Sequence, residues 1–191
     1  MKNRAFTMGI LALALAAVVA AACHFQTTAQ KTDNWTDKAI DQYKDQYSYY
    51  RILDINGDGN NELFLSNQEG TFFTDEGKVL LLANQDGKIT EVEEYSYPGG
   101  FMLYYNAEDH KLTFMTRLAG SGESHICRYN GDKMQEETVI ERYGPFHDPR
   151  VENREMTYYV NRKAVQKAEY DRYANEYMKE NYQLKLHEID Q

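Results

Sequence analysis

The chain has 191 residues and a formal net charge of −9, because 30 acidic side chains outnumber 21 lysine and arginine side chains. Acidic surfaces repel the phosphates of nucleic acids and of anionic lipids, so we expect no nucleic-acid partner and no electrostatic docking to a membrane. The length fits one domain with its own core. The sequence contains no GxSxG, P-loop, HExxH or GxGxxG motif.

Residues 1–22 have the composition of an export signal peptide, with two basic residues ahead of an apolar stretch that ends in small residues. Small residues directly before Cys23 resemble the site at which lipoproteins are cleaved and acylated, so we expect lipidation of Cys23. Ala20 and Ala22 also fit an ordinary cleavage site, and an uncleaved membrane anchor is a third interpretation. We therefore expect a protein of the cell envelope, lipid-anchored outside the cytoplasm, or a secreted one.

The segment 23–34 is polar and has no periodicity, which predicts a lipid-anchored tether ahead of a single domain over residues 35–191. Without residues 1–22, 30 acidic residues face 19 basic ones, and the net charge becomes −11. Cys127 is the only other cysteine, so lipidation of Cys23 leaves no disulfide, whereas a free Cys23 would allow a bridge between the two.

A first helix is predicted over residues 36–48, where Ile40, Tyr43, Tyr47 and Tyr50 recur at helical spacing. The run DINGDGNNEL follows at 54–63 and places oxygen-bearing side chains at alternate positions around a glycine. Such a run is typical of a calcium loop, because Ca²⁺ binds roughly six to eight oxygen ligands and tolerates few others.

The run D-x-N-x-D-G-x-x-E-L resembles the calcium loops of FG-GAP and VCBS β-repeats and the related, EF-hand-like loop of a group of secreted bacterial lipoproteins of unknown function. The resemblance extends over about residues 35–182, through YSYYRIL, GGFMLYYN and YYVNRKAVQKAEYDRY. It implies Ca²⁺ as the bound ion. The ligands that it implies are Asp54, Asn56, Asp58, Asn60 through its carbonyl, and Glu62.

A solvated turn between two strands is the alternative interpretation of this run, because Asn-Gly and Asp-Gly are favoured hairpin dipeptides. The calcium interpretation accounts for three carboxylates within nine residues, which repel one another unless a cation lies between them. Three formal charges predict weak, extracellular-range affinity, with a Kd of about 10⁻⁴ to 10⁻³ M.

Beyond the loop the period changes to short alternating runs separated by turn residues, which predicts an antiparallel β-meander. The fold class is therefore α+β, with about eight strands, one helix before them and one helix, at about 167–180, after them. The run 79–82 is apolar on both faces and is expected to lie centrally. The expected strands are 62–67, 70–74, 78–84, 88–96, 101–106, 111–118, 124–130, 133–142, where glutamates predict a solvated face, and 155–160.

Sixteen tyrosines could form a carbohydrate-binding surface, although half-buried packing explains most of them. His125 and Cys127 share a face on a strand, which allows a thiol nucleophile with an imidazole base or, more simply, a buried cysteine. Glu123, His147 and Asp148 lie on expected loops, where functional groups are frequent.

These patterns together predict a noncatalytic, envelope-anchored module with structural Ca²⁺ and a glycan or protein ligand at the cell surface. The alternative is a secreted, calcium-stabilised hydrolase that acts on a glycan or peptide. We expect no catalytic residue from a recognised motif and no membrane contact beyond the N-terminal lipid or anchor.

Overall fold

The computed structural model describes residues 34–69, 72–118, 120–145, 148–150 and 155–190. The predicted signal peptide, Cys23 and His147 lie outside these residues. Within the described part of the chain, no helix has the length and apolar character that spanning a membrane requires.

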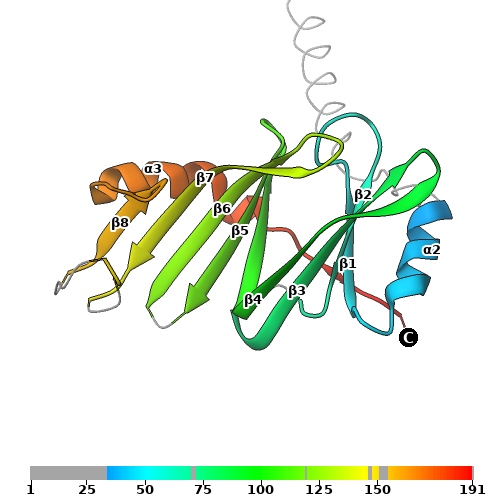
Figure 1. Cartoon of the computed structure of the whole chain (residues 1–191), viewed down its shortest axis with the longest axis horizontal. Helices are drawn as coiled ribbons and strands as arrows, with labels where there is room; N and C mark the ends of the chain where they lie inside the picture. Colours follow the sequence, from blue (N-terminus) through cyan, green and yellow to red (C-terminus); the bar gives the residue numbers. More distant parts are fainter. Residues whose placement is uncertain (1–33, 70–71, 119, 146–147, 151–154, 191) are drawn as a thin grey trace, which may run out of the picture. The chain divides into compact units, whose positions relative to one another are not determined.

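The described residues form one antiparallel sheet of ten strands in the order β10-β1-β2-β3-β4-β5-β6-β7-β8-β9 (Figure 1). The meander follows the chain from β1 to β9, and only β10 returns from the C-terminal end to pair with β1. The strands are β1 (Tyr49–Leu53), β2 (Glu62–Ser66), β3 (Phe72–Gln85), β4 (Lys88–Asn106), β5 (Lys111–Leu118), β6 (Ser121–Tyr129), β7 (Met134–Tyr143), β8 (Thr157–Val160), β9 (Lys163–Ala164) and β10 (His187–Glu188).

Two α-helices flank the sheet in the chain, as predicted: α2 (Asn34–Tyr43) precedes β1, and α3 (Lys167–Tyr177) follows β9. A single 3₁₀ turn, η1 (Glu180–Tyr182), precedes β10. The α+β class is confirmed, but ten strands replace the expected eight or so. Helix α2 ends at Tyr43 instead of about 48, because the chain turns there, with the amides of Gln46 and Tyr47 bonded to the Tyr43 carbonyl, before Tyr49 begins β1.

Strands β3 and β4 each join two predicted strands. Strand β4 pairs with β3 up to Gly100, with an irregularity between Pro98 and Gly100, and with β5 from Phe101 onward, so its partner changes directly after Gly99 and Gly100. Both glycines have positive φ, at 79° and 87°, a conformation that other residues adopt at a cost. This change of direction lets one continuous strand serve both halves of the sheet.

The main core forms where the sheet bends back on itself. Val79 and Leu81 of β3 share a buried cluster with Phe114 of β5 and Cys127 of β6, although these strands are not neighbours in the sheet. We call the side of the sheet that carries these residues the inner face. The predicted burial of the 79–82 run on both faces is confirmed, because Leu80 and Leu82 lie in a second cluster on the outer face.

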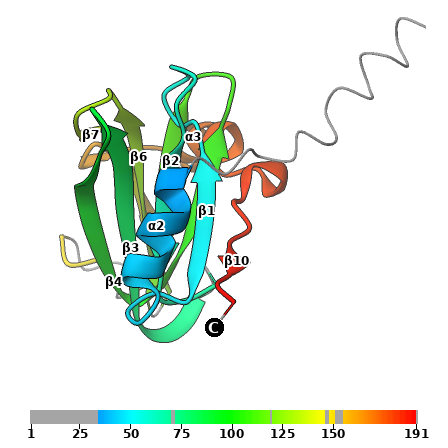
Figure 2. The ribbon, with the colours of Figure 1, turned by 90° about the vertical axis from the view of Figure 1, so that its right-hand side faces the viewer.

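The helices cover the outer face. Ala39 of α2 packs with Leu63 and Leu65, and Figure 2 shows α2 in front of β1–β3. Tyr170 of α3 packs against Ile140 of β7 and Val160 of β8. The inner face is thus the side from which polar groups of β4, β6 and β7 can be reached.

The predicted solvated face of residues 133–142 is correct for one half of β7 only. Gln135, Glu136 and Glu137 are exposed, but Glu141 is 4% exposed. Glu141 is buried because the following loop brings Arg150 against its carboxylate.

Candidate functional site

The DINGDGNNEL run connects β1 to β2 as an eight-residue hairpin loop, with Leu53 and Glu62 paired at its base. The loop was expected to follow the first helix directly, but β1 lies between them. Gly57 and Gly59 have φ of 77° and 89°, and a Cβ at Gly57 would lie 2.6 Å from Cε1 of His110. Glycine is therefore required where the loop passes the β4–β5 turn.

Backbone amides of the loop donate hydrogen bonds to its acidic side chains. The Asp54 carboxylate accepts hydrogen bonds from the amides of Gly57 and Gly59 at 2.7 and 2.9 Å, and Asp58 accepts one from Asn60 at 2.7 Å. Nδ2 of Asn56 donates to Asp58 at 3.1 Å. These hydrogen bonds hold the loop backbone close to the Asp54 and Asp58 carboxylates.

Glu62 differs from the other proposed ligands because it is 3% exposed. It points to the inner face, as Phe64 two residues later does, and its Oε2 accepts the amide hydrogen of Ile55 at 2.9 Å. Burial, with the charges of Asp58 and Asp54 adding to it, raises the pKa of Glu62 to about 7. An ionised Glu62 thus lacks a compensating charge among the described groups around it.

The described residues contain no group of three or more His, Cys, Asp or Glu side chains arranged to hold a metal ion. The oxygens of the loop suit Ca²⁺ by chemical type. In the described arrangement the side-chain amide of Asn56 faces Asp58, so a metal centre at these residues requires at least that side chain to turn its oxygen inward.

A second candidate site lies on the inner face, between the first half of β4 and strands β6 and β7. Two hollows of about 250 and 270 Å³ adjoin there and share Tyr97 and His125 as lining residues. We call them together the acidic groove, lined among others by Glu93, Tyr95, Tyr97, Glu123, His125 and Glu136.

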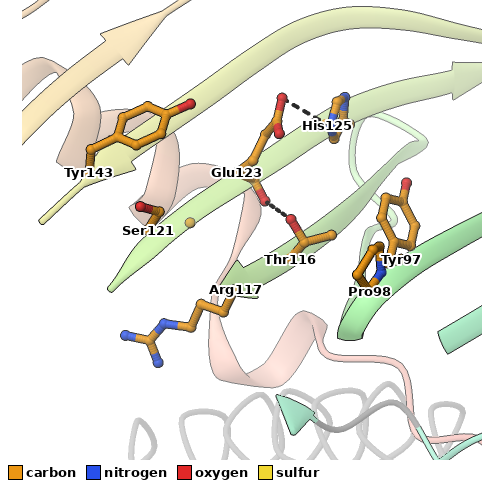
Figure 3. A pocket seen from close by; sticks show the side chains of 9 residues that line it. Tyr97, Pro98, Thr116, Arg117, Ser121, Glu123, His125 and Tyr143 are labelled. Carbon is orange, nitrogen blue, oxygen red and sulfur yellow. Dashed lines mark hydrogen bonds and ion pairs between the residues drawn. The ribbon is translucent and has the colours of Figure 1, made fainter. Parts of the chain in front are cut away.

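His125 lies between two carboxylates in this groove. Its Nδ1 is 2.6 Å from Glu136 and its Nε2 is 3.4 Å from Glu123. Figure 3 shows Glu123 and His125 side by side on β6, with the Tyr97 ring across from His125. The rings of Tyr95 and Tyr97 are stacked at 6.2 Å, and Tyr95 packs on Phe114 at 4.2 Å.

Cys127 lies on the same face as His125, as predicted, and is a free, buried cysteine. Burial, followed by the charge of Glu136, raises the pKa of the Cys127 thiol to about 12. A thiol with this pKa is almost entirely protonated at neutral pH and is a poor nucleophile. The interpretation as a small buried side chain therefore explains Cys127 better than a catalytic role.

Arg150 and Asp148 organise the β7–β8 loop beside the groove. The Arg150 guanidinium bonds to Glu141 and lies over the rings of Tyr159 and Tyr143, at 4.0 and 5.0 Å from their centroids. Asp148 accepts hydrogen bonds from Tyr159 and Thr157 at 2.6 Å each. Asp148 is among the residues expected from the sequence, but the pair of Glu141 and Arg150 is not, because only the folding of the β7–β8 loop brings them together.

Comparison with protein-family models, with curated proteins and with solved structures finds no match to this chain.

Proposed function

We propose that residues 35–191 form a noncatalytic, calcium-stabilised module that works outside the cytoplasm, anchored through a lipid on Cys23 or secreted. The observation that carries the calcium part is Glu62, a buried carboxylate beside Asp54 and Asp58 whose pKa burial raises to about 7. A buried, ionised carboxylate of this kind destabilises the fold unless a cation neutralises its charge.

In this proposal Asp54, Asn56, Asp58, Asn60 and Glu62 supply the oxygens. Bound Ca²⁺ would supply positive charge at the base of the loop. Glu62 and Ile55 connect the loop to the core, since the Glu62 carboxylate holds the amide of Ile55, whose side chain is 1% exposed. The weak affinity expected of three carboxylates suits extracellular calcium concentrations.

A noncatalytic role is favoured over the secreted hydrolase by two groups in the acidic groove region. Glu141, which pairs with Glu123 across β6 and β7, is buried under Arg150 and so is poorly placed to act on a substrate. The pKa of Cys127 is raised, which opposes thiolate chemistry. The groove is better suited to binding.

The calcium proposal is tested with Asp58→Asn, which removes one charge from the loop and keeps the size of the side chain. With 10 mM Ca²⁺ and the expected affinity, the wild-type domain should gain about 1.4–2.7 kcal/mol, or roughly 3–10 °C in Tm. Asp58→Asn should lose most of this gain, because the loop keeps two carboxylates. The measurement is thermal unfolding in calcium and in EDTA.

The matched control is Asp86→Asn in the β3–β4 turn, an exposed position with φ of 52°, which asparagine tolerates. It changes the net charge equally and should keep the full calcium-dependent gain. A wild-type domain whose Tm is the same in calcium and in EDTA, or an Asp58→Asn domain with an undiminished gain, would refute the proposal.

A further inference from the structure

Thioether side chains gather on the outer face of the sheet, on the opposite side from the acidic groove. Met102 of β4 pairs directly with Met115 of β5, and Met115 pairs with Ser124 of β6. Ser124 pairs in turn with Ile140 of β7, which packs under α3. Residues that pair directly share a face, so this row crosses four strands on the side that α3 covers.

A third methionine reaches the row from the helix. Met178 follows the last residue of α3, and its Sδ lies 3.2 Å from Oγ of Ser124. The sulfurs of Met102 and Met115 both lie against the Tyr104 hydroxyl, at 3.7 and 3.9 Å. We call Met102, Met115 and Met178 the methionine cluster. All three residues are partly exposed, so a dissolved ion can reach the cluster.

Buried hydroxyl groups around the methionine cluster lack oxygen or nitrogen partners. Tyr104 and Ser124 are 7% and 1% exposed, and in the described part of the chain their hydroxyls bond only to thioether sulfur, a weak acceptor. Thr113 pairs with Tyr104 and is 1% exposed, and its Oγ1 is buried without a hydrogen-bond partner among the described residues. Buried polar groups that the protein leaves unsatisfied are frequently completed by an ion or a bound water.

The donor atoms determine which ion suits the cluster. Thioether sulfur favours soft cations such as Cu⁺, whereas Ca²⁺ and Mg²⁺ favour oxygen. Thioethers carry no charge to offset that of a divalent ion, so a monovalent ion is less costly to hold there. Arg117 and Arg142 lie on the same face, but both are accessible to solvent, which screens their repulsion of a cation. The three rotatable bonds of methionine let the sulfurs converge on one ion.

We infer that the methionine cluster binds one soft monovalent cation of the Cu⁺ class, with Met102 and Met115 as ligands from the sheet and Met178 as a ligand from the end of α3. Each thioether has two lone pairs, so a sulfur can bind the ion and still accept a hydroxyl. The bound ion would link β4 and β5 to α3. This site goes beyond the function proposed above and shares no residue with the calcium loop.

The probe for this site is Ag⁺, which has the ligand preference of Cu⁺ and is not readily oxidised. The full chain is kept in detergent, isotopically labelled at its methionine methyl groups, and titrated with silver nitrate in chloride-free buffer. Cys23 and Cys127 are replaced by alanine, because thiols compete for Ag⁺. In NMR spectra the three methyl signals of the methionine cluster should shift together and saturate at one Ag⁺ per chain, whereas those of Met134 and Met156 should stay in place.

Met115→Leu removes the central sulfur and nearly keeps the volume of the side chain, so the fold should survive. It should weaken Ag⁺ binding at least about tenfold, since even the loss of groups that only orient metal ligands has effects of this size. The matched control is Met134→Leu, which replaces another half-buried methionine on a strand and should leave the Kd unchanged.

Shifts of Met156 as large as those of the cluster, a titration without saturation, or full affinity in Met115→Leu would overturn the inference. If the cysteine-free chain does not fold, the wild-type chain decides. Met134 lines the same hollow as Cys127 and reports an ion bound by that thiol, so shifts confined to Met134 would also overturn the inference. Ca²⁺ in place of Ag⁺ should leave the cluster signals unmoved, and equal shifts with Ca²⁺ would refute a preference for soft ions.

Discussion

The role of Glu62 depends on the face of the sheet to which β2 directs its side chain. Glu62 begins β2, and strand alternation places it on the same side as Phe64, in the core rather than in solvent. A carboxylate whose folded pKa is raised keeps its proton longer in the native state, so Glu62 costs stability progressively as the pH rises from about 4.5 to about 7, and the full cost is present above pH 7. Replacing Glu62 by a neutral residue and binding a cation beside it should therefore each reduce the free-energy cost of this buried charge.

Glu62→Gln should have opposite consequences without and with calcium. At pH 8 in EDTA the variant should be more stable than the wild type by about 1–3 kcal/mol, because no buried charge remains. In 10 mM Ca²⁺ it should show little further gain, because a ligand is missing. Urea unfolding in the two buffers measures both effects. A variant less stable than wild type in EDTA would show that the buried charge is already compensated.

Among the elements, β4 connects the two halves of the sheet. Its nineteen residues pair with β3 up to Gly100 and with β5 from Phe101 onward, and the positive φ angles of Gly99 and Gly100 lie where the partner changes. The tyrosines of the first half, Tyr95 and Tyr97, thereby come to lie across from His125 and Cys127 of β6. The acidic groove is a consequence of this bend.

Gly99→Ala should destabilise the domain by about 1–2 kcal/mol, because alanine at φ 79° brings its Cβ against the backbone. Thermal or urea unfolding measures the loss. Gly122→Ala is the control, since the φ of Gly122 lies outside the left-handed region and an added Cβ would approach Nε of Arg142 no closer than 3.4 Å. Equal losses in the two variants would show that the φ of Gly99 carries no special cost.

At the scale of the described domain, the C-terminal segment joins the two halves of the sheet. The Leu184 amide bonds to Leu103 of β4, β10 pairs with β1, and the Ile189 amide bonds to Ser48 at 2.8 Å. Ile189 is 7% exposed and lies in the outer-face cluster with Ala39 of α2. Figure 2 shows this segment running alongside β1.

Ile189→Ala should lower the free energy of unfolding by roughly 2–3 kcal/mol and the Tm by about 5–10 °C, because it leaves a cavity between α2 and the sheet. Met156→Ala is the control, since Met156 is 38% exposed. Guanidinium unfolding measures both. Loss of the same size in the control would mean that the C-terminal segment does not hold the sheet in the way described.

Sequence periodicity predicted the meander and both helices because these depend on local alternation and on residues three or four apart. Val79 to Leu82 were recognised as buried on both faces from their composition alone. Tyr50 continues the helical spacing of Ile40, Tyr43 and Tyr47 but lies beyond the predicted end of the helix at 48, and pairing with Leu65 and His187 places it in β1. The strands of two residues carry no periodicity and could not be predicted.

The amino-acid order alone determined the oxygen-rich loop, the acidic charge and the α+β class, because each is a property of neighbours in the chain. The tertiary structure alone decided that Glu62 is buried, that Glu141 meets Arg150, and that Glu123, His125 and Glu136 lie opposite Tyr97. These contacts join residues separated by strand register and by the bend of β4, and neither register nor bend is fixed by any short run of sequence.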